Sequence, residues 1–239
     1  DADCSEVSIG AATGPEDHWL ENRGVEVLAD LVGYRYRTPR GRDYAVVDLS
    51  VSAVPAGFPE TASLRGSLLS AAWTDAAFRI SFAKNRTHEE LGYALGLWNL
   101  LSILPLRDRQ YHYADRLDIR EVALELLRHV PPHFSLVDAY WSNDGSLGGR
   151  APHPIQTSTI LAGRNLALVD YAGALKMGLD PFVSPINAMV LDELGLGGPY
   201  TLDGPLSPYE GWKNPHPLLC ASFRAVSRST ALSRIEGPL

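Results

Sequence analysis

The chain has 239 residues, of which 45% are hydrophobic and 21% are charged, and its formal net charge is −7. This composition is typical of a folded globular protein and excludes a disordered one. The acidic balance disfavours nucleic acid and anionic membranes as partners, because both require a basic binding surface. The two cysteines, Cys4 and Cys220, are too few for a ferredoxin-type set, so we expect no iron–sulfur cluster within this chain.

The sequence also indicates the cellular compartment of the protein. We find no signal-peptide pattern and no apolar run of about 18 residues, which predicts a chain without a membrane span. The low cysteine content then favours a cytoplasmic location. The sequence begins at Asp1 rather than at a methionine, so we interpret it as a trimmed chain or a fragment of a longer protein.

The first third of the chain predicts short strands around one helix. Residues 7–12 and residues 44–49 are apolar runs that are typical of strands. Asp17 is placed to cap a helix between them. Residues 54–66 contain prolines and glycines and predict a hairpin or an excursion, and residues 68–73 predict a short helix.

The next segment predicts a strand followed by a helix. Residues 78–83 alternate apolar and polar side chains, as a strand does. Thr87 and Glu90 have the spacing of a capping box. The sequence therefore predicts a helix that begins at His88 and ends at Pro105, with apolar side chains every three to four residues.

Helices and strands alternate in the remainder of the chain. The predicted helices cover residues 120–129, 166–177, 185–194 and 223–235, and the predicted strands cover residues 134–141 and 157–162. Residues 197–217 are rich in Gly, Pro, Tyr and Trp and predict an irregular C-terminal wrap. This order predicts an α/β fold with a mixed, partly parallel sheet flanked by helices, in a single large domain over residues 1–239.

A basic and polar cluster follows the strand at 78–83. It consists of Lys84, Asn85, Arg86, Thr87 and His88. Beside the free N–H groups of a helix that begins at His88, Lys84 and Arg86 would attract a carboxylate or a phosphate. His88 would then be a neutral base or a metal ligand. The alternative is that the two cations are solvated loop charges.

A second polar segment follows the strand at 134–141. It contains Asn143, Asp144 and Gly145, with Gly149 shortly after. Glycine lets the backbone approach a ligand closely, and ligands of open α/β sheets bind beyond the carboxyl ends of the strands. We therefore predict that these residues form one wall of a ligand site. The alternative is a tight turn selected only for its geometry.

Two further acids, Asp138 and Asp170, lie in apolar contexts. A buried acid is paired, hydrogen-bonded or protonated, so each is either a structural anchor or a tuned functional group, and the anchor is the more frequent case. We predict His88, Asp144 and Asp170 as catalytic residues. Their side chains are also suitable ligands for a divalent metal. The sequence does not show whether a metal is bound, so the cofactor is unknown.

Several familiar motifs are absent from the sequence. The chain has no GxGxxG after a predicted strand, no phosphate-binding GxxxxGK[ST], no HExxH and no GxSxG. The motifs therefore identify no reaction.

Short segments with a particular order and spacing run through most of the chain. They are residues 82–84, 87–88, 98–105, 111–112, 137–138, 143–152, 159–163, 168–170 and 176–181. In this order they resemble the domain-of-unknown-function family 362, which is found in many bacteria and archaea. The resemblance covers residues 7–217 and leaves 218–239 as a C-terminal extension. It implies a mixed α/β fold and an enzyme-like pocket, without a known reaction.

The resemblance also concerns individual residues. Asn99 and Gly149 lie in the matching segments, and we include both among the ligand-binding residues. Relatives usually carry a lysine just before this asparagine, whereas this chain has Trp98. Some members of the family carry ferredoxin-type cysteine sets, which this chain lacks.

The sequence thus predicts an enzyme that acts on a small anionic substrate, with or without a divalent metal. The predicted ligand-binding residues are Lys84, Arg86, Thr87, Asn99, Asn143, Gly145 and Gly149. The alternative is a non-catalytic binding or accessory module that uses the same pocket. In a third interpretation, the aromatic segment at 200–212 forms an oligomer contact. The sequence does not name the substrate, the metal or the oligomeric state.

Overall fold

The structure is a computed structural model that describes residues 4, 6–13, 24–105, 113, 117–145, 153–196 and 199–227. Contacts between residues divide the chain into two compact units. One unit comprises Asp1–Ala77 and Leu101–Leu117, and the other comprises Phe78–Leu100 and Asp118–Leu239. The single domain over 1–239 stays a prediction.

The first unit contains two small sheets. Its elements are β1 (Ser8–Ala11), α1 (Val25–Leu31), β2 (Ala45–Asp48), β3 (Ala53–Pro55), β4 (Leu68–Ser70), α2 (Ala71–Thr74) and the 3-10 helix η3 (Leu101–Ile103). β1 and β2 pair in parallel, whereas β3 and β4 pair antiparallel. A small core of Val25, Ala29 and Val46 joins α1 to β2.

The strands predicted at 7–12 and 44–49 and the hairpin are confirmed in this unit. The helix predicted at 68–73 is wrong in its first half, because Leu68–Ser70 pairs with β3 and only Ala71–Thr74 is helical. α1 begins after Gly24, and the predicted cap Asp17 lies outside the described residues.

The second unit contains a four-stranded sheet in the order β6-β5-β7-β8. Its elements are β5 (Ile80–His88), β6 (Gly92–Tyr93), α3 (Gly96–Leu100), α4 (Ile119–His129), β7 (Phe134–Asp144), β8 (His153–Gly163), α5 (Leu166–Lys176), the 3-10 helix η6 (Pro181–Val183), α6 (Pro185–Leu194) and α7 (Pro217–Ser227). β5 is parallel to β7, and the other neighbours are antiparallel. The predicted mixed, partly parallel sheet flanked by helices is confirmed.

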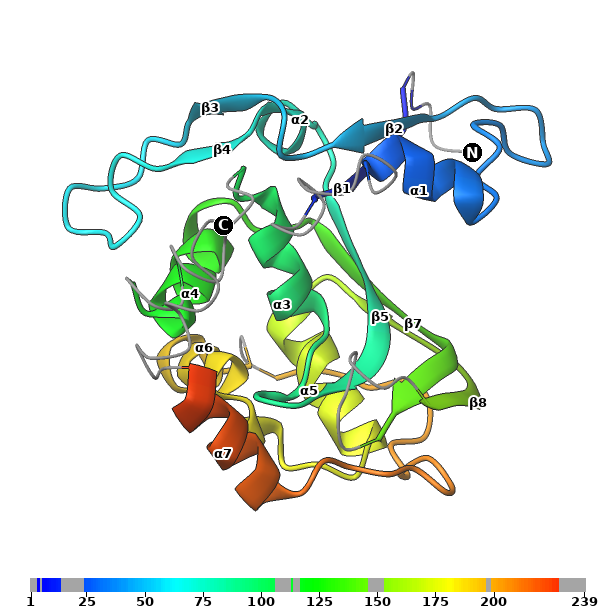
Figure 1. The fold of residues 1–239 in the computed structure, drawn as a ribbon, viewed down its shortest axis with the longest axis vertical. Helices are drawn as coiled ribbons and strands as arrows, with labels where there is room; N and C mark the ends of the chain where they lie inside the picture. Colours follow the sequence, from blue (N-terminus) through cyan, green and yellow to red (C-terminus); the bar gives the residue numbers. More distant parts are fainter. Residues whose placement is uncertain are drawn as a thin grey trace. The chain divides into compact units, whose positions relative to one another are not determined.

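Helices cover one face of this sheet. Along β5, the side chains of Ser81, Ala83, Asn85 and Thr87 are buried, and those between them are more exposed. The buried face forms a core with apolar side chains from α5 and from the segment that leads into α3. Figure 1 shows α3 and α5 on the same side of β5 and β7.

The helix predicted to begin at His88 is wrong. Residues 80–88 form one continuous strand, and Gly92, with φ +80°, turns the chain back into β6. The Thr87 hydroxyl donates to the carbonyl of Gly145 at 2.9 Å instead of capping a helix. Helical structure begins only at Gly96, so the anion site that we placed at a helix N-terminus does not exist in that form.

The later predictions agree better with the structure. α4, α5 and α6 are confirmed, and the side chains of Asp118 and Asn165 accept hydrogen bonds from the first turns of α4 and α5. β7 and β8 are both longer than predicted, so Asn143 and Asp144 belong to the strand itself. α7 begins at Pro217, earlier than the predicted helix at 223–235.

The irregular C-terminal wrap is confirmed over residues 199–216, which contain no regular element. It is attached to α5 at two points. The Lys176 ammonium donates to the carbonyl of Ser207 at 2.8 Å, and the backbone N–H of Tyr209 donates to the carbonyl of Lys176 at 2.8 Å. Among the described residues, no helix is long and apolar enough to cross a membrane.

Candidate functional site

The parallel pairing of β5 and β7 brings the two predicted polar clusters together. Lys84 is paired with Asp138, and Arg86 is paired with Asn143 across a bulge. The hydrogen bond from Thr87 to Gly145 joins the two strand ends. The parallel pairing therefore places the two predicted polar clusters next to each other at the carboxyl ends of the strands.

Arg86 is the least satisfied charge at these strand ends. Its side chain is half-buried, and burial lowers the pKa of the guanidinium, whereas the nearby charge of Glu89 raises it. In the described part of the chain, no oxygen atom accepts a hydrogen bond from this guanidinium. A partly desolvated cation with unused donors is suited to bind an anionic group.

His88 lies two residues further along the same strand. Its Nδ1 accepts hydrogen bonds from the backbone N–H groups of Glu90 at 3.2 Å and Leu91 at 3.4 Å. In the neutral ring the proton therefore resides on Nε2, which is a donor. The Glu89 carboxylate is 3.9 Å from Nδ1, beyond hydrogen-bond distance. The Trp98 ring meets the imidazole edge-on, with 5.0 Å between ring centroids.

Three residues near the end of β5 were missed in the sequence. Glu89 is buried beside His88, while Arg224 from α7 donates to the carbonyl of Glu90. Cys220 of α7 is also buried here, and burial raises the pKa of its thiol, although the charge of Arg224 lowers it. The sequence predicted Glu89 within the helix that begins at His88, which does not form. No local signal connects α7 to a turn 134 residues earlier in the chain.

Asp144 is fully buried at the end of β7. One carboxylate oxygen is 2.6 Å from Nδ1 of His153, and the other accepts the backbone N–H of Lys213 at 2.8 Å. The backbone N–H of Gly145 donates in turn to the carbonyl of Lys213 at 2.9 Å. These contacts attach the C-terminal wrap to the sheet and give Asp144 a structural role, whereas its catalytic role stays a prediction.

Asp170 is fully buried in α5. Its carboxylate accepts the backbone N–H groups of Gly96 at 2.8 Å and Leu97 at 2.9 Å, and the side-chain amide of Asn187 at 3.1 Å. Burial raises its pKa to about 6, although the three hydrogen bonds oppose this change. These contacts favour the structural anchor over the tuned functional group.

Other predicted residues also have partners within the protein. Lys84 forms a 2.8 Å ion pair with Asp138, and Asn99 donates to the carbonyl of Phe82 at 3.0 Å. Burial alone would raise the pKa of Asp138, but the bonds from Lys84 and from the backbone of Tyr140 lower it overall.

Asn143 and Gly149 complete the predicted set. The side-chain oxygen of Asn143 accepts the backbone N–H of His153 at 2.6 Å. Gly149 lies outside the described residues.

The three predicted catalytic residues have separate partners. Asp170 is hydrogen-bonded to α3 and α6. Asp144 is hydrogen-bonded to the C-terminal wrap and to β8. His88 is hydrogen-bonded to the turn after β5. No hydrogen bond that the structure shows in its described part joins them directly. Among those residues there is also no group of three or more His, Cys, Asp or Glu side chains arranged to hold a metal ion.

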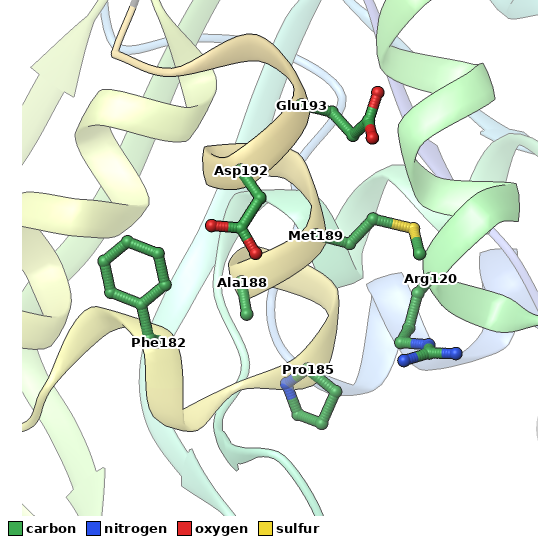
Figure 2. Close-up of a pocket in the computed structure, with 7 residues that line it drawn as sticks. All are labelled: Arg120, Phe182, Pro185, Ala188, Met189, Asp192 and Glu193. Atoms are coloured by element: carbon green, nitrogen blue, oxygen red, sulfur yellow. The ribbon is translucent and has the colours of Figure 1, made fainter.

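A surface pocket lies elsewhere in the second unit, along α6 (Figure 2). Its volume is about 420 Å³, and Arg120 from α4 and Phe182 from η6 border it together with Met189, Asp192 and Glu193. Arg120 is paired with Asp118, and Glu193 is paired with Arg128. None of the predicted site residues lines this pocket.

Comparison with known families gives one match. The model of a family described as Domain of unknown function (DUF362) matches residues 2–175. No curated protein and no solved structure matches the chain. Because the matched region covers most of the sequence, the chain belongs to the DUF362 family.

Proposed function

We propose that this member of the DUF362 family binds a small anionic molecule, a carboxylate or a phosphate, at the carboxyl ends of β5 and β7, and that Arg86 is the charged anchor. The observation that carries the proposal is the half-buried Arg86 guanidinium, to which no oxygen of the described chain is hydrogen-bonded. Such a group loses hydration without gaining a hydrogen-bonded acceptor, although Glu89 is close enough to attract its charge, and a bidentate anion would restore the missing hydrogen bonds.

The neighbours of Arg86 fit this role. His88 lies on the same face of β5 as Arg86, two residues further along the strand. Asn143 is the partner of Arg86 on β7. In this proposal Asp144 and Asp170 position the strand end and α3, and Lys84 is held by Asp138 rather than by the ligand.

Catalysis at this site would use His88 for proton transfer, with or without a divalent metal. One observation favours the second candidate, a binding module without turnover. Trp98 occupies the position of the lysine that relatives usually carry, and its ring lies against His88. The Trp98 ring can pack against a ligand, whereas a lysine at this position could also supply a positive charge or a proton for catalysis. The cytoplasmic location is a further part of the proposal, supported by the low cysteine count.

Thermal stabilisation by ligands tests the proposal directly. A panel of carboxylates and inorganic phosphate would be screened against the wild-type chain, Arg86→Gln and the exposed control Arg65→Gln. We expect at least one anion to raise the Tm of the wild type and of Arg65→Gln but not that of Arg86→Gln. Equal stabilisation of all three proteins would overturn the assignment. Elemental analysis of the wild type and His88→Ala would show whether a metal belongs to the site.

A further inference from the structure

One face of the second unit's sheet is rich in exposed apolar side chains. Ile80 and Phe82 of β5 are 50% and 57% exposed, and Ile160 of β8 is 65% exposed. Tyr140 and Trp141, at the bulge of β7, are each 51% exposed. These five residues, with the side chains between them, are called the open face below.

The strand register makes the open face continuous. Phe82 is paired with Leu136, which is paired with Ala162, so an apolar row crosses β5, β7 and β8. The next row contains Lys84, Asp138 and Ile160. The open face is opposite to the buried side chains that pack on the helices, as the alternation along β5 and β7 requires.

Such a face is unusual for a sheet that contains a parallel pair. Parallel strands are normally covered on both sides, and contiguous exposed apolar surface on a soluble protein marks an interaction site. About half of each of the five side chains is exposed. At about 200 Å² for a large side chain they offer roughly 500 Å², a large part of the ~800 Å² that each partner contributes to a standard interface.

The charges on the open face indicate the partner. It carries the ion pair of Lys84 with Asp138, 2.8 Å apart, and these side chains are 48% and 34% exposed. Arg86 lies on the same face further along β5, so the open face carries charges of both signs, and a face with both signs can be complementary to itself under a two-fold rotation. A strongly charged partner would find no net charge to match in this pair.

We propose that two copies of this chain pack through their open faces and form a symmetric dimer in which the two sheets become a sandwich. Each sheet then has helices on its outer face and the other sheet on its inner face, which is a standard two-sheet packing. The Lys84–Asp138 pair of each copy meets that of the other near the centre of the contact. Arg86 lies on the same face of β5, beyond Lys84 towards the end of the strand, and the mass measurements below test the dimer without an anion.

Molecular mass in solution tests the dimer. Sedimentation or light scattering over a range of protein concentrations would compare the wild type with Phe82→Arg, Ile160→Asp and the control Val51→Arg, which changes an apolar residue of the first unit that is 75% exposed. We expect a dimer for the wild type and the control, and monomers for the two open-face variants. Circular dichroism and Tm would establish that the variants are folded.

Exchanging the charges of Lys84 and Asp138 distinguishes a dimer through the open face from a dimer through another surface. Lys84→Asp alone should dissociate the dimer because four carboxylates then meet, and addition of Asp138→Lys should restore it. A monomeric wild type at the highest concentration would overturn the proposal and leave the open face for another partner. A dimer that survives Phe82→Arg and Ile160→Asp but dissociates in Tyr200→Asp would also overturn it, and would place the interface on the C-terminal wrap.

Discussion

The carboxylate of Asp170 lies 2.8 Å from the backbone nitrogen of Gly96, a residue 74 positions earlier in the chain. Together with the bond from Leu97, this contact satisfies two of the free N–H groups at the start of α3. α3 has only five residues, which is too short to be stable on its own. The buried acid of one helix therefore acts as the N-terminal cap of another.

Replacement of this acid should be severely destabilising. Asp170→Ala would leave the N–H groups of Gly96 and Leu97 and the amide of Asn187 without their acceptor. Each buried donor without a partner costs about 1–3 kcal/mol, so we expect a loss of about 3–5 kcal/mol in the free energy of unfolding. Urea denaturation at pH 7 measures it, with the exposed Asp192→Ala as a control. A loss below about 1 kcal/mol would contradict the anchoring role.

The raised pKa of Asp170 also predicts a pH dependence of stability. Burial raises this pKa from 3.8 to about 6. Between these values the folded protein binds more protons than the unfolded chain, so this group's contribution to stability falls as the pH rises through this window and is constant above it. The shift corresponds to about 3 kcal/mol.

A matched variant isolates this titration from that of other groups. Asp170→Asn does not ionise, so the difference in unfolding free energy between the wild type and this variant should fall by about 2 kcal/mol from pH 4 to pH 7, because part of the full effect is already lost at pH 4. A constant difference, or an NMR titration of the Asp170 carboxyl group with a midpoint near pH 4, would show that the buried carboxyl is not shifted.

Much of the second unit could be predicted from local sequence signals. α4 and α5 begin where Asp118 and Asn165 cap them, and α6 begins at a proline, because these interactions lie within one helical turn. The proximity of Arg86 and Asn143 was also predictable, because polar residues follow two apolar strands that pair in parallel.

The error at His88 has a physical cause. Thr87 and Glu90 have the spacing of a capping box, but the Thr87 hydroxyl instead bonds to Gly145, 58 residues away. Pairing with β7 along the strand outweighs a local preference for a helix. The roles of Asp144 and Asp170 as anchors likewise depend on partners distant in sequence, which no local pattern identifies.

Asp144 should hold the C-terminal wrap in place. In Asp144→Ala the backbone N–H of Lys213 loses a charged acceptor, a bond that contributes about 1.5–3 kcal/mol. We expect amide hydrogen exchange at Lys213 and its neighbours to accelerate about 10- to 100-fold. Asp203→Ala, which changes an exposed acid in the same segment, should leave exchange near Lys213 unchanged. Equal exchange in Asp144→Ala and the wild type would exclude the attachment.

Arg86 should reduce stability in the absence of a ligand if it serves to bind an anion. Its guanidinium is partly desolvated and has no hydrogen-bonded oxygen among the described residues, and the attraction of Glu89 does not offset the effect of burial on its pKa, so Arg86→Met removes a partly desolvated charge and retains an apolar stem. We expect the unfolding free energy of this variant to equal or exceed that of the wild type, with no further gain on addition of an anion. Chemical denaturation with and without the stabilising anion measures both effects, and Arg65→Met is the exposed control. A loss above about 1 kcal/mol without ligand would instead identify Arg86 as a structural residue.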